Sequence, residues 1–145
     1  MTPEIIDSRL RRFLLGLTTF MFAGTVGELL LQEHYNETLQ LIPFGLCALG
    51  LVALIAAQAR PNRRTLLALR GAMAVVAAGG LLGMWLHLSG NYTFESEIRP
   101  NAAFGELILD TLRGANPLLA PGILVFASLI AAAATYYHPA LGEPS

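Results

Sequence analysis

The sequence predicts an all-α integral membrane protein, an antiparallel bundle of four transmembrane helices with an additional amphipathic helix in the third connection. Only 13% of the 145 residues are charged and 54% are apolar, whereas soluble domains have about 25% charged residues. Apolar segments cover residues 13–31, 42–59, 65–88 and 118–137, and about 20 residues suffice to cross roughly 30 Å of hydrocarbon. We therefore expect one membrane domain over residues 1–145.

The first apolar segment, residues 13–31, has Glu28 as its only charge and follows three arginines. A cleaved signal peptide has the same pattern of charge followed by apolar residues, but we interpret this segment as a retained span. Thr2 and Pro3 are typical of a capping residue and a first helical position. Asp7 and Arg11 are spaced as partners on successive helical turns. We therefore expect the first helix to begin before the membrane.

The other three expected spans also have their proline and charged residues near their ends. Pro43 lies in the first turn of 42–59, where its missing N–H costs little. Residues 65–88 have Arg70 near the start and His87 near the end, and residues 118–137 have no charge. The connections after the first and second spans are short, which favours antiparallel neighbours.

The third connection, residues 89–117, is long enough to fold. Residues 101–114 are expected to form a helix that Asn101 caps and Gly114 ends. Its apolar face would contain Phe104, Leu107, Ile108 and Leu112. We expect this helix to lie in the membrane interface, over the mouth of the bundle or among headgroups. The residues before it, 90–98, suggest a turn and a short extended piece.

The arginines predict the orientation of the chain, because positive charge collects on the cytoplasmic side. Seven of nine lie on one side of the expected spans, and seven of ten acidic residues lie on the other. We therefore expect both termini in the cytoplasm. Arginine without any lysine, together with abundant Ala, Leu and Gly, favours a bacterial inner (cytoplasmic) membrane.

Small residues recur at a spacing of four, which allows close helix approach in lipid. The pattern is consistent with helix packing within the bundle, with packing between copies of the chain in a homo-oligomer, or with packing against other membrane protein subunits. The stripes are Thr19, Ala23 and Gly27; Gly79 and Gly83; and Ala127 and Ala131.

Glu28 is the costliest side chain to place, since charge inside a membrane is unfavourable. It either reaches headgroups or becomes protonated, or it forms a proton or cation site that faces the bundle interior.

His34 and His87 are expected at the same membrane level, where they could ligate a divalent metal or haem iron. Glu95 and Glu97 could add oxygen ligands. We expect His87 to approach His34 with Glu28 one turn below. The alternative is a pair of interfacial histidines beside the aromatic residues that gather at membrane surfaces.

Other sequence features limit the function. The lone Cys47 excludes an internal disulfide, and a net charge of −1 argues against binding nucleic acid. Asn36 and Asn91 each begin a glycosylation sequon. Familiar nucleotide-binding, hydrolase and zinc-protease motifs are absent from the sequence, and this absence argues against an enzymatic function.

These observations favour a small, non-catalytic accessory or scaffold subunit that packs against partner membrane proteins in the lipid bilayer. Two alternatives stay open. One is a metal- or haem-binding redox protein that uses His34 and His87, and the other is an oligomeric transporter or channel protomer that uses Glu28.

Overall fold

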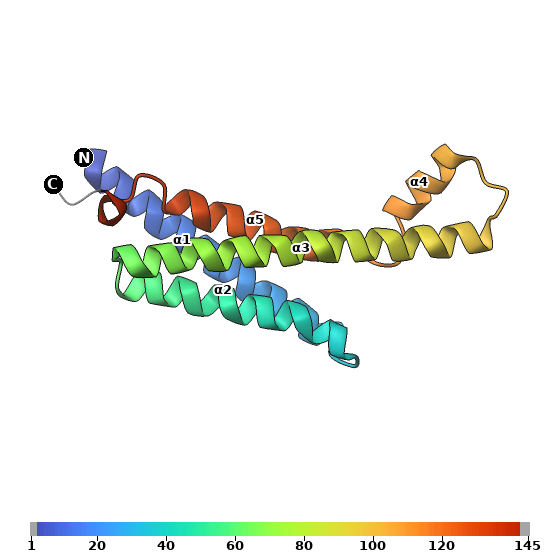
Figure 1. Ribbon diagram of the computed structural model, residues 1–145, viewed down its shortest axis with the longest axis horizontal. Helices are drawn as coiled ribbons and strands as arrows, with labels where there is room; N and C mark the ends of the chain where they lie inside the picture. Colours follow the sequence, from blue (N-terminus) through green and yellow to red (C-terminus); the bar gives the residue numbers. More distant parts are fainter. Residues whose placement is uncertain (1–2, 143–145) are drawn as a thin grey trace.

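The computed structural model describes residues 3–142, which are almost entirely helical and contain no strand (Figure 1). The five α-helices are α1 (Pro3–Leu31), α2 (Ile42–Ala59), α3 (Arg63–Ile98), α4 (Phe104–Leu112) and α5 (Leu119–Ala134). Two short 3-10 helices, η1 (Thr38–Leu41) and η2 (Pro139–Leu141), complete the described chain. The all-α prediction is therefore confirmed for these residues.

Three segments are long and apolar enough to cross a membrane, namely Glu4–Leu31, Thr38–Ala59 and Arg63–Ile98. The fourth expected span corresponds to α5, which is equally apolar but has only 16 residues. The chain thus has three candidate membrane spans and one shorter apolar helix.

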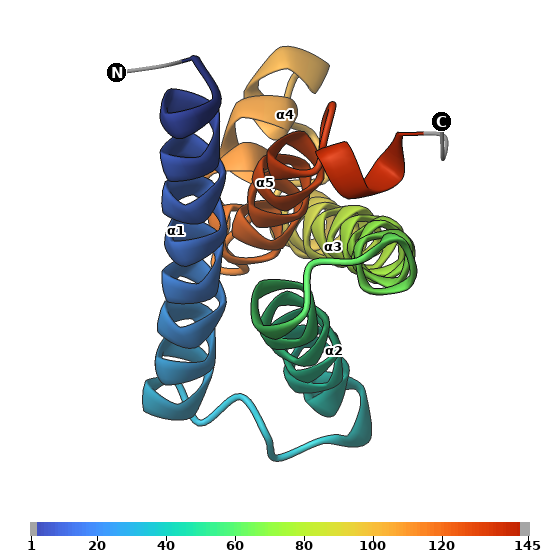
Figure 2. The same ribbon diagram turned by 90° about the vertical axis from the view of Figure 1, so that its left-hand side faces the viewer.

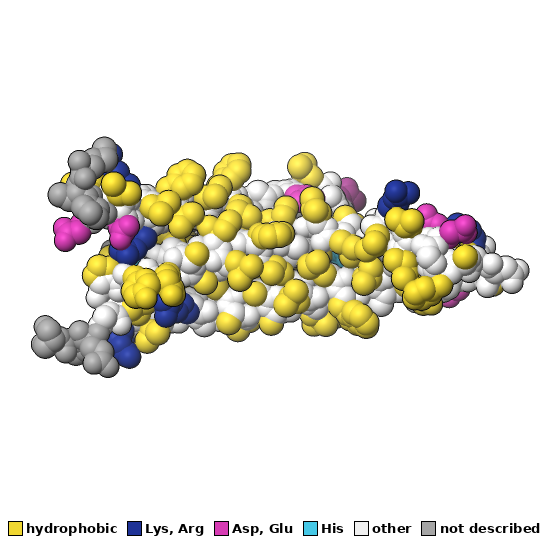
Figure 3. Space-filling view, turned by 90° about the horizontal axis from the view of Figure 1, so that it is seen from above, with side chains coloured by type: hydrophobic (Ala, Val, Ile, Leu, Met, Phe, Trp, Pro, Cys, Tyr) yellow, Lys and Arg dark blue, Asp and Glu magenta, His cyan; other side chains and the backbone are white. Residues whose placement is uncertain are grey.

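Helices α1, α2, α3 and α5 pack side by side into an elongated bundle (Figures 1 and 2). Phe22, Leu54, Leu69 and Met73 form its fully buried centre. Large apolar side chains such as Phe20 are exposed on the sides of the rod, while most charged groups gather toward its two ends (Figure 3). This surface suits an apolar solvent around the middle of the rod.

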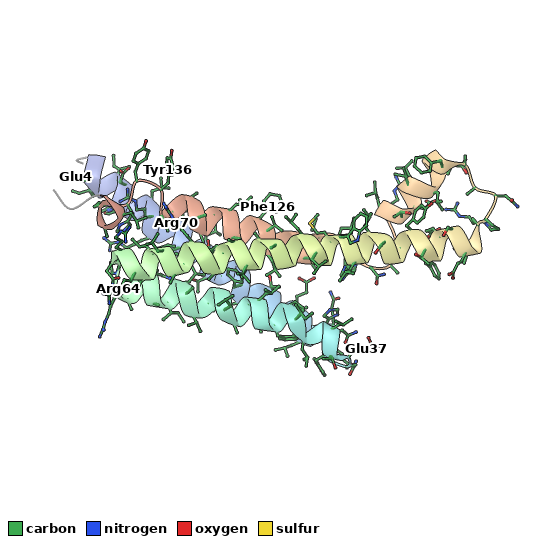
Figure 4. All side chains as sticks on the ribbon, in the orientation of Figure 1. Glu4, Glu37, Arg64, Arg70, Phe126 and Tyr136 are labelled. Atoms are coloured by element: carbon green, nitrogen blue, oxygen red, sulfur yellow. The ribbon has the colours of Figure 1, made fainter. Side chains whose placement is uncertain are left out.

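The two ends of the rod differ in what they contain. The beginning of α1, the α2–α3 turn and η2 lie together at one end (Figure 2), which we call the basic end. Arg64 and Arg70 are near this end, whereas Glu37 lies at the far end of α2 (Figure 4). We call the opposite end of the rod the arm end.

Helix α3 is longer than the sequence predicted. It begins after Asn62, whose side-chain oxygen accepts from the N–H groups of Arg64 and Thr65, and its 36 residues extend about 54 Å. The predicted turn and extended piece at 90–98 are wrong, because these residues continue the helix. Arg99 stabilises its end through an ion pair with Glu95, 3.1 Å away and one turn back.

Helix α4 forms a hairpin with the far part of α3, and together residues 89–116 make what we call the arm (Figure 1). The predicted boundaries of 101–114 were too wide, since α4 begins after Ala103 and Asn101 does not cap it. Leu107 and Thr111 are buried, and α3 is the only described helix that α4 contacts. The arm therefore projects from the bundle and leaves the bundle mouth uncovered.

Helix α5 ends three residues before the predicted limit of 137. Arginines from two other helices bind the carbonyl groups just beyond its end. Arg70 of α3 donates to the Thr135 hydroxyl and carbonyl at 2.8 and 3.1 Å, and Arg11 of α1 donates to the Tyr137 carbonyl at 2.9 Å. Positive charge at a helix C-terminus also complements the helix dipole.

The small residues of α3 and α5 pack inside the bundle, whereas two of those on α1 do not. A Cβ atom at Gly79 would lie 2.5 Å from Leu46, and one at Gly83 would lie 3.0 Å from Pro121, so this pair allows close packing within the bundle. Ala127 and Ala131 are fully buried there as well. On α1, by contrast, a Cβ atom at Gly27 would meet no atom within 4 Å, and Ala23 is exposed.

Candidate functional site at the mouth of the bundle

A cavity of about 290 Å³ opens between α1, α2, α3 and α5 at the arm end of the bundle. The α1–α2 connection and the residues leading into α5 complete its wall. Most of its lining is apolar, and its polar side chains are Thr25, Glu28, Gln32, His34, Gln40, His87 and Asn116. The three residues expected to lie together at the bundle mouth, Glu28, His34 and His87, therefore line one cavity.

The end of α1 fixes the position of His34. The His34 N–H donates to the Leu29 carbonyl at 2.9 Å, and the Glu33 N–H donates to the Leu30 carbonyl at 3.1 Å. These two bonds form a Schellman motif, in which Glu33 takes the left-handed conformation at φ 52°. The end of α1 at Leu31 agrees with the predicted limit of the first span, but glycine usually occupies the position of Glu33, so the motif that turns His34 back toward the cavity was not predicted.

Glu28 lies about one turn before the end of α1 and is half-buried. Its carboxylate accepts a hydrogen bond from the Gln32 amide at 3.2 Å. The Gln32 amide is the hydrogen-bond partner that the structure shows for this carboxylate, which also lines the mouth cavity.

His87 binds the Pro117 carbonyl, two residues before α5 begins. Its Nδ1 lies 2.8 Å from the Pro117 carbonyl oxygen. Because a carbonyl can only accept, Nδ1 carries the proton. The lone pair of the neutral ring is then on Nε2. Metal-binding histidines use this arrangement, but here the bond also holds the entrance of α5 against α3.

Glu95 and Glu97 do not join this cavity. They follow His87 by two to three turns of the continuous helix α3, a rise of about 12 to 15 Å. Glu95 instead pairs with Arg99, which also pairs with Asp110 across the arm. Within residues 3–142, no three His, Cys, Asp or Glu side chains are grouped closely enough to hold a metal ion.

Buried side chains lie between the mouth cavity and a second cavity at the basic end. Along α1, Phe22 falls between Leu15, which lines the basic-end cavity, and Thr25, which lines the mouth cavity. Met73 has the same intermediate position on α3, and both side chains are fully buried. The two cavities are therefore separated by packed core.

Asn91 is a structural residue that the sequence did not reveal. It is 2% exposed, and its amide donates to the carbonyls of Thr111 and Asn116 at 3.1 and 2.9 Å. Its oxygen accepts from the Asn116 N–H at 3.0 Å. These bonds tie the end of α4 and the entrance of α5 to α3, and they leave the sequon at Asn91 inaccessible. The other sequon asparagine, Asn36, is exposed.

The mouth cavity offers two imidazoles, a carboxylate and amide groups beside apolar walls. This combination suits a small ligand with an apolar body and a polar or cationic group. It contains no assembled set of catalytic residues of a familiar type. No protein-family model, curated protein or solved structure matches this chain.

Proposed function

We propose that the chain is a four-span protein of a bacterial inner membrane, with both termini in the cytoplasm. In that membrane it acts as a non-catalytic accessory subunit, and its arm docks on a partner membrane protein. The exposed apolar surface of the arm is the observation that supports this proposal.

The length of α3 supports a position of the arm beyond the hydrocarbon. A helix of about 54 Å is far longer than a bilayer core of about 30 Å, and the bundle extends along α3 only as far as His87, which contacts the entrance of α5. The last turns of α3 and all of α4 then stand outside the acyl chains. Apolar side chains in this part of the arm are then not in contact with lipid acyl chains.

Several large apolar side chains of the arm are exposed. Phe104 is 71% exposed, and Ile108 and Leu112 follow it on one side of α4. On α3, Phe94 and Ile98 are also more than half exposed. Large apolar side chains exposed together in this way typically mark a contact with another protein.

The charge of the arm favours a different protein over a second copy of this chain. Residues 89–116 contain four acidic side chains and two arginines. Arg99 is already paired with Glu95 and Asp110, whereas Glu97 and Glu106 are exposed. Two copies would bring like charges together, so the expected partner has an apolar surface with a basic rim.

The outward side of α1 offers a second contact within the membrane. A Cβ atom added at Gly16, Gly24 or Gly27 would meet nothing within 4 Å. Small residues on a lipid-facing surface let a neighbouring helix approach closely. An accessory subunit can use this side of α1 together with the arm.

Photo-crosslinking in the native membrane tests the docking proposal. A photoreactive residue at Phe104 or Leu112 of the arm should give one discrete crosslinked protein, identified by mass spectrometry. The control position is Phe126 of α5, which is 65% exposed on the bundle side (Figure 4). A crosslink at Phe104 to a second copy, or no protein crosslink at all, would exclude the proposed hetero-partner.

Cysteine labelling tests the orientation. In a Cys47→Ala background, an impermeant maleimide should label Asn36→Cys and Glu97→Cys in intact cells. Arg64→Cys should react only after the cells are permeabilised. The opposite pattern would reverse the proposed topology.

Metal binding through His34 and His87 is the second candidate function. The favouring observation is that both imidazoles line the mouth cavity, with His87 protonated on Nδ1 and its Nε2 available. The chain would have to recruit further ligands from Glu28 or water. Equilibrium dialysis with zinc should show one bound ion in the wild-type protein and none in His34→Ala. Equal binding by the two proteins would refute this site.

A further inference from the structure

We propose that the cavity at the basic end binds the phosphate of an anionic glycerophospholipid. This site is separate from the arm and from the mouth cavity, and the proposed accessory function does not require it.

The cavity has a volume of about 460 Å³ and lies between the beginning of α1, the α2–α3 turn and the residues after α5. Figure 2 shows these three segments of the chain at the end that faces the viewer. Its lower wall is apolar, with Leu15, Ala57, Leu66 and Ala134. Arg11, Arg12 and His138 also line it, together with Ser8, Gln58 and Thr135. The volume is within the range of sites that bind small molecules, about 300 to 1,000 Å³.

Three of the polar side chains that line the cavity offer hydrogen-bond donors to an anion. Nδ1 of His138 accepts from the Ala140 N–H at 3.1 Å, so the proton of the neutral ring is on Nε2 and available to donate. Arg11 uses one nitrogen for the Tyr137 carbonyl and retains further N–H groups. Arg12 makes no ion pair among the described residues and offers its whole guanidinium.

Little negative charge opposes these donors. Asp7 is the nearest acid to Arg11, at 3.8 Å, and its side chain is 64% exposed. Burial and, to a smaller extent, the positive charge of Arg11 lower the pKa of His138, so the guanidinium of Arg11 acts on the imidazole beside it. An oxyanion at this position would meet charge-assisted donors from three side chains.

The apolar wall favours a lipid over a soluble phosphate. A free phosphate ion has no apolar part that could contact Leu15 and Leu66, whereas the glycerol and upper acyl carbons of a lipid can contact both. Basic pockets between helices on the cytoplasmic side of membranes are suited to such headgroups.

The test uses the delipidated full-length protein in a non-ionic detergent. It is titrated with phosphatidylglycerol and, separately, with phosphatidylcholine of the same acyl chains. Native mass spectrometry counts the bound lipids. One saturable phosphatidylglycerol is expected, with at least fivefold weaker binding of phosphatidylcholine.

Arg12→Gln should weaken phosphatidylglycerol binding about fivefold, the factor that corresponds to roughly 1 kcal/mol per basic residue. Arg63→Gln is the matched control, because Arg63 is exposed at the same end and does not line the cavity. It should change the affinity less than twofold. Thermal unfolding without lipid verifies that both variants are folded.

Three results would overturn the proposal. Equal losses in the two variants would indicate a diffuse basic surface. Equal affinity for the two lipids would remove the anion preference. Displacement of phosphatidylglycerol by millimolar inorganic phosphate, with equal thermal stabilisation by phosphate alone, would assign the cavity to a soluble anion.

Discussion

Replacing Asn91 tests how the arm is attached to the bundle. The Asn91→Ala substitution removes three hydrogen bonds, those to the Thr111 carbonyl and to the carbonyl and N–H of Asn116. Each bond contributes about 0.5 to 1.5 kcal/mol. Because Asn116 is exposed, water can replace part of what is lost there. We therefore expect a loss near the lower end of the sum, about 2 kcal/mol.

The loss should appear as local opening of α4, since the bulk of the core lies elsewhere in the bundle. A change of about 2 kcal/mol corresponds to roughly 30-fold less protection from amide hydrogen exchange. Mass-spectrometric exchange on the full-length protein in detergent measures this in peptides covering α4. Peptides from α2 should keep their protection.

Two further variants make the test specific. Asn91→Asp preserves the shape but places an oxygen against two carbonyl oxygens, so it should lower protection at least as much. Asn101→Ala removes an exposed asparagine that does not cap α4, and it should have little effect. If Asn91→Ala left α4 protection within twofold of the wild type, the attachment described here would be wrong.

Two other predictions concern the core and the C-terminal turn. Gly50→Ala would place a Cβ atom 2.7 Å from the fully buried ring of Phe22 and should destabilise the protein by about 1 to 3 kcal/mol. At Gly45 an added Cβ atom would meet nothing within 4 Å, so Gly45→Ala should not destabilise the protein. Thermal unfolding of the two variants should show a loss of stability for Gly50→Ala alone. Burial and Arg11 lower the pKa of His138, so its stabilising contribution is present above about pH 6.5 and is lost as the pH falls through the folded pKa. NMR titration should give a pKa below 6.5 that rises in Arg11→Gln, and an unshifted value would contradict the burial of the ring.

The sequence predicted the apolar helices well, because hydrophobic length and flanking charge are local properties. The predicted range 42–59 coincides with α2. The end of α3 was missed because Gly90 and the polar residues after it look like a loop when read alone. In the structure, packing of α4 through Leu107 and the Glu95–Arg99 pair extends the helix instead.

The candidate site was predicted only in part, since it depends on contacts between distant residues. Glu28, His34 and His87 line one cavity, but Glu95 and Glu97 belong to the arm. Asn101 looked like a cap by spacing, while Asn91, which ties the arm to α5, gave no local signal. Its partners are 20 and 25 residues away in the chain.

The unequal lengths of the helices have a consequence for the bilayer itself. Helix α5 has 16 residues and α2 has 18, which correspond to about 24 and 27 Å. Both are shorter than the roughly 30 Å of an average hydrocarbon core. If α5 crosses the membrane as proposed, the lipid beside it thins locally, and this hydrophobic mismatch costs a fraction of a kcal/mol for each ångström. The protein should accordingly partition into thinner bilayers when it is offered membranes of graded acyl-chain length.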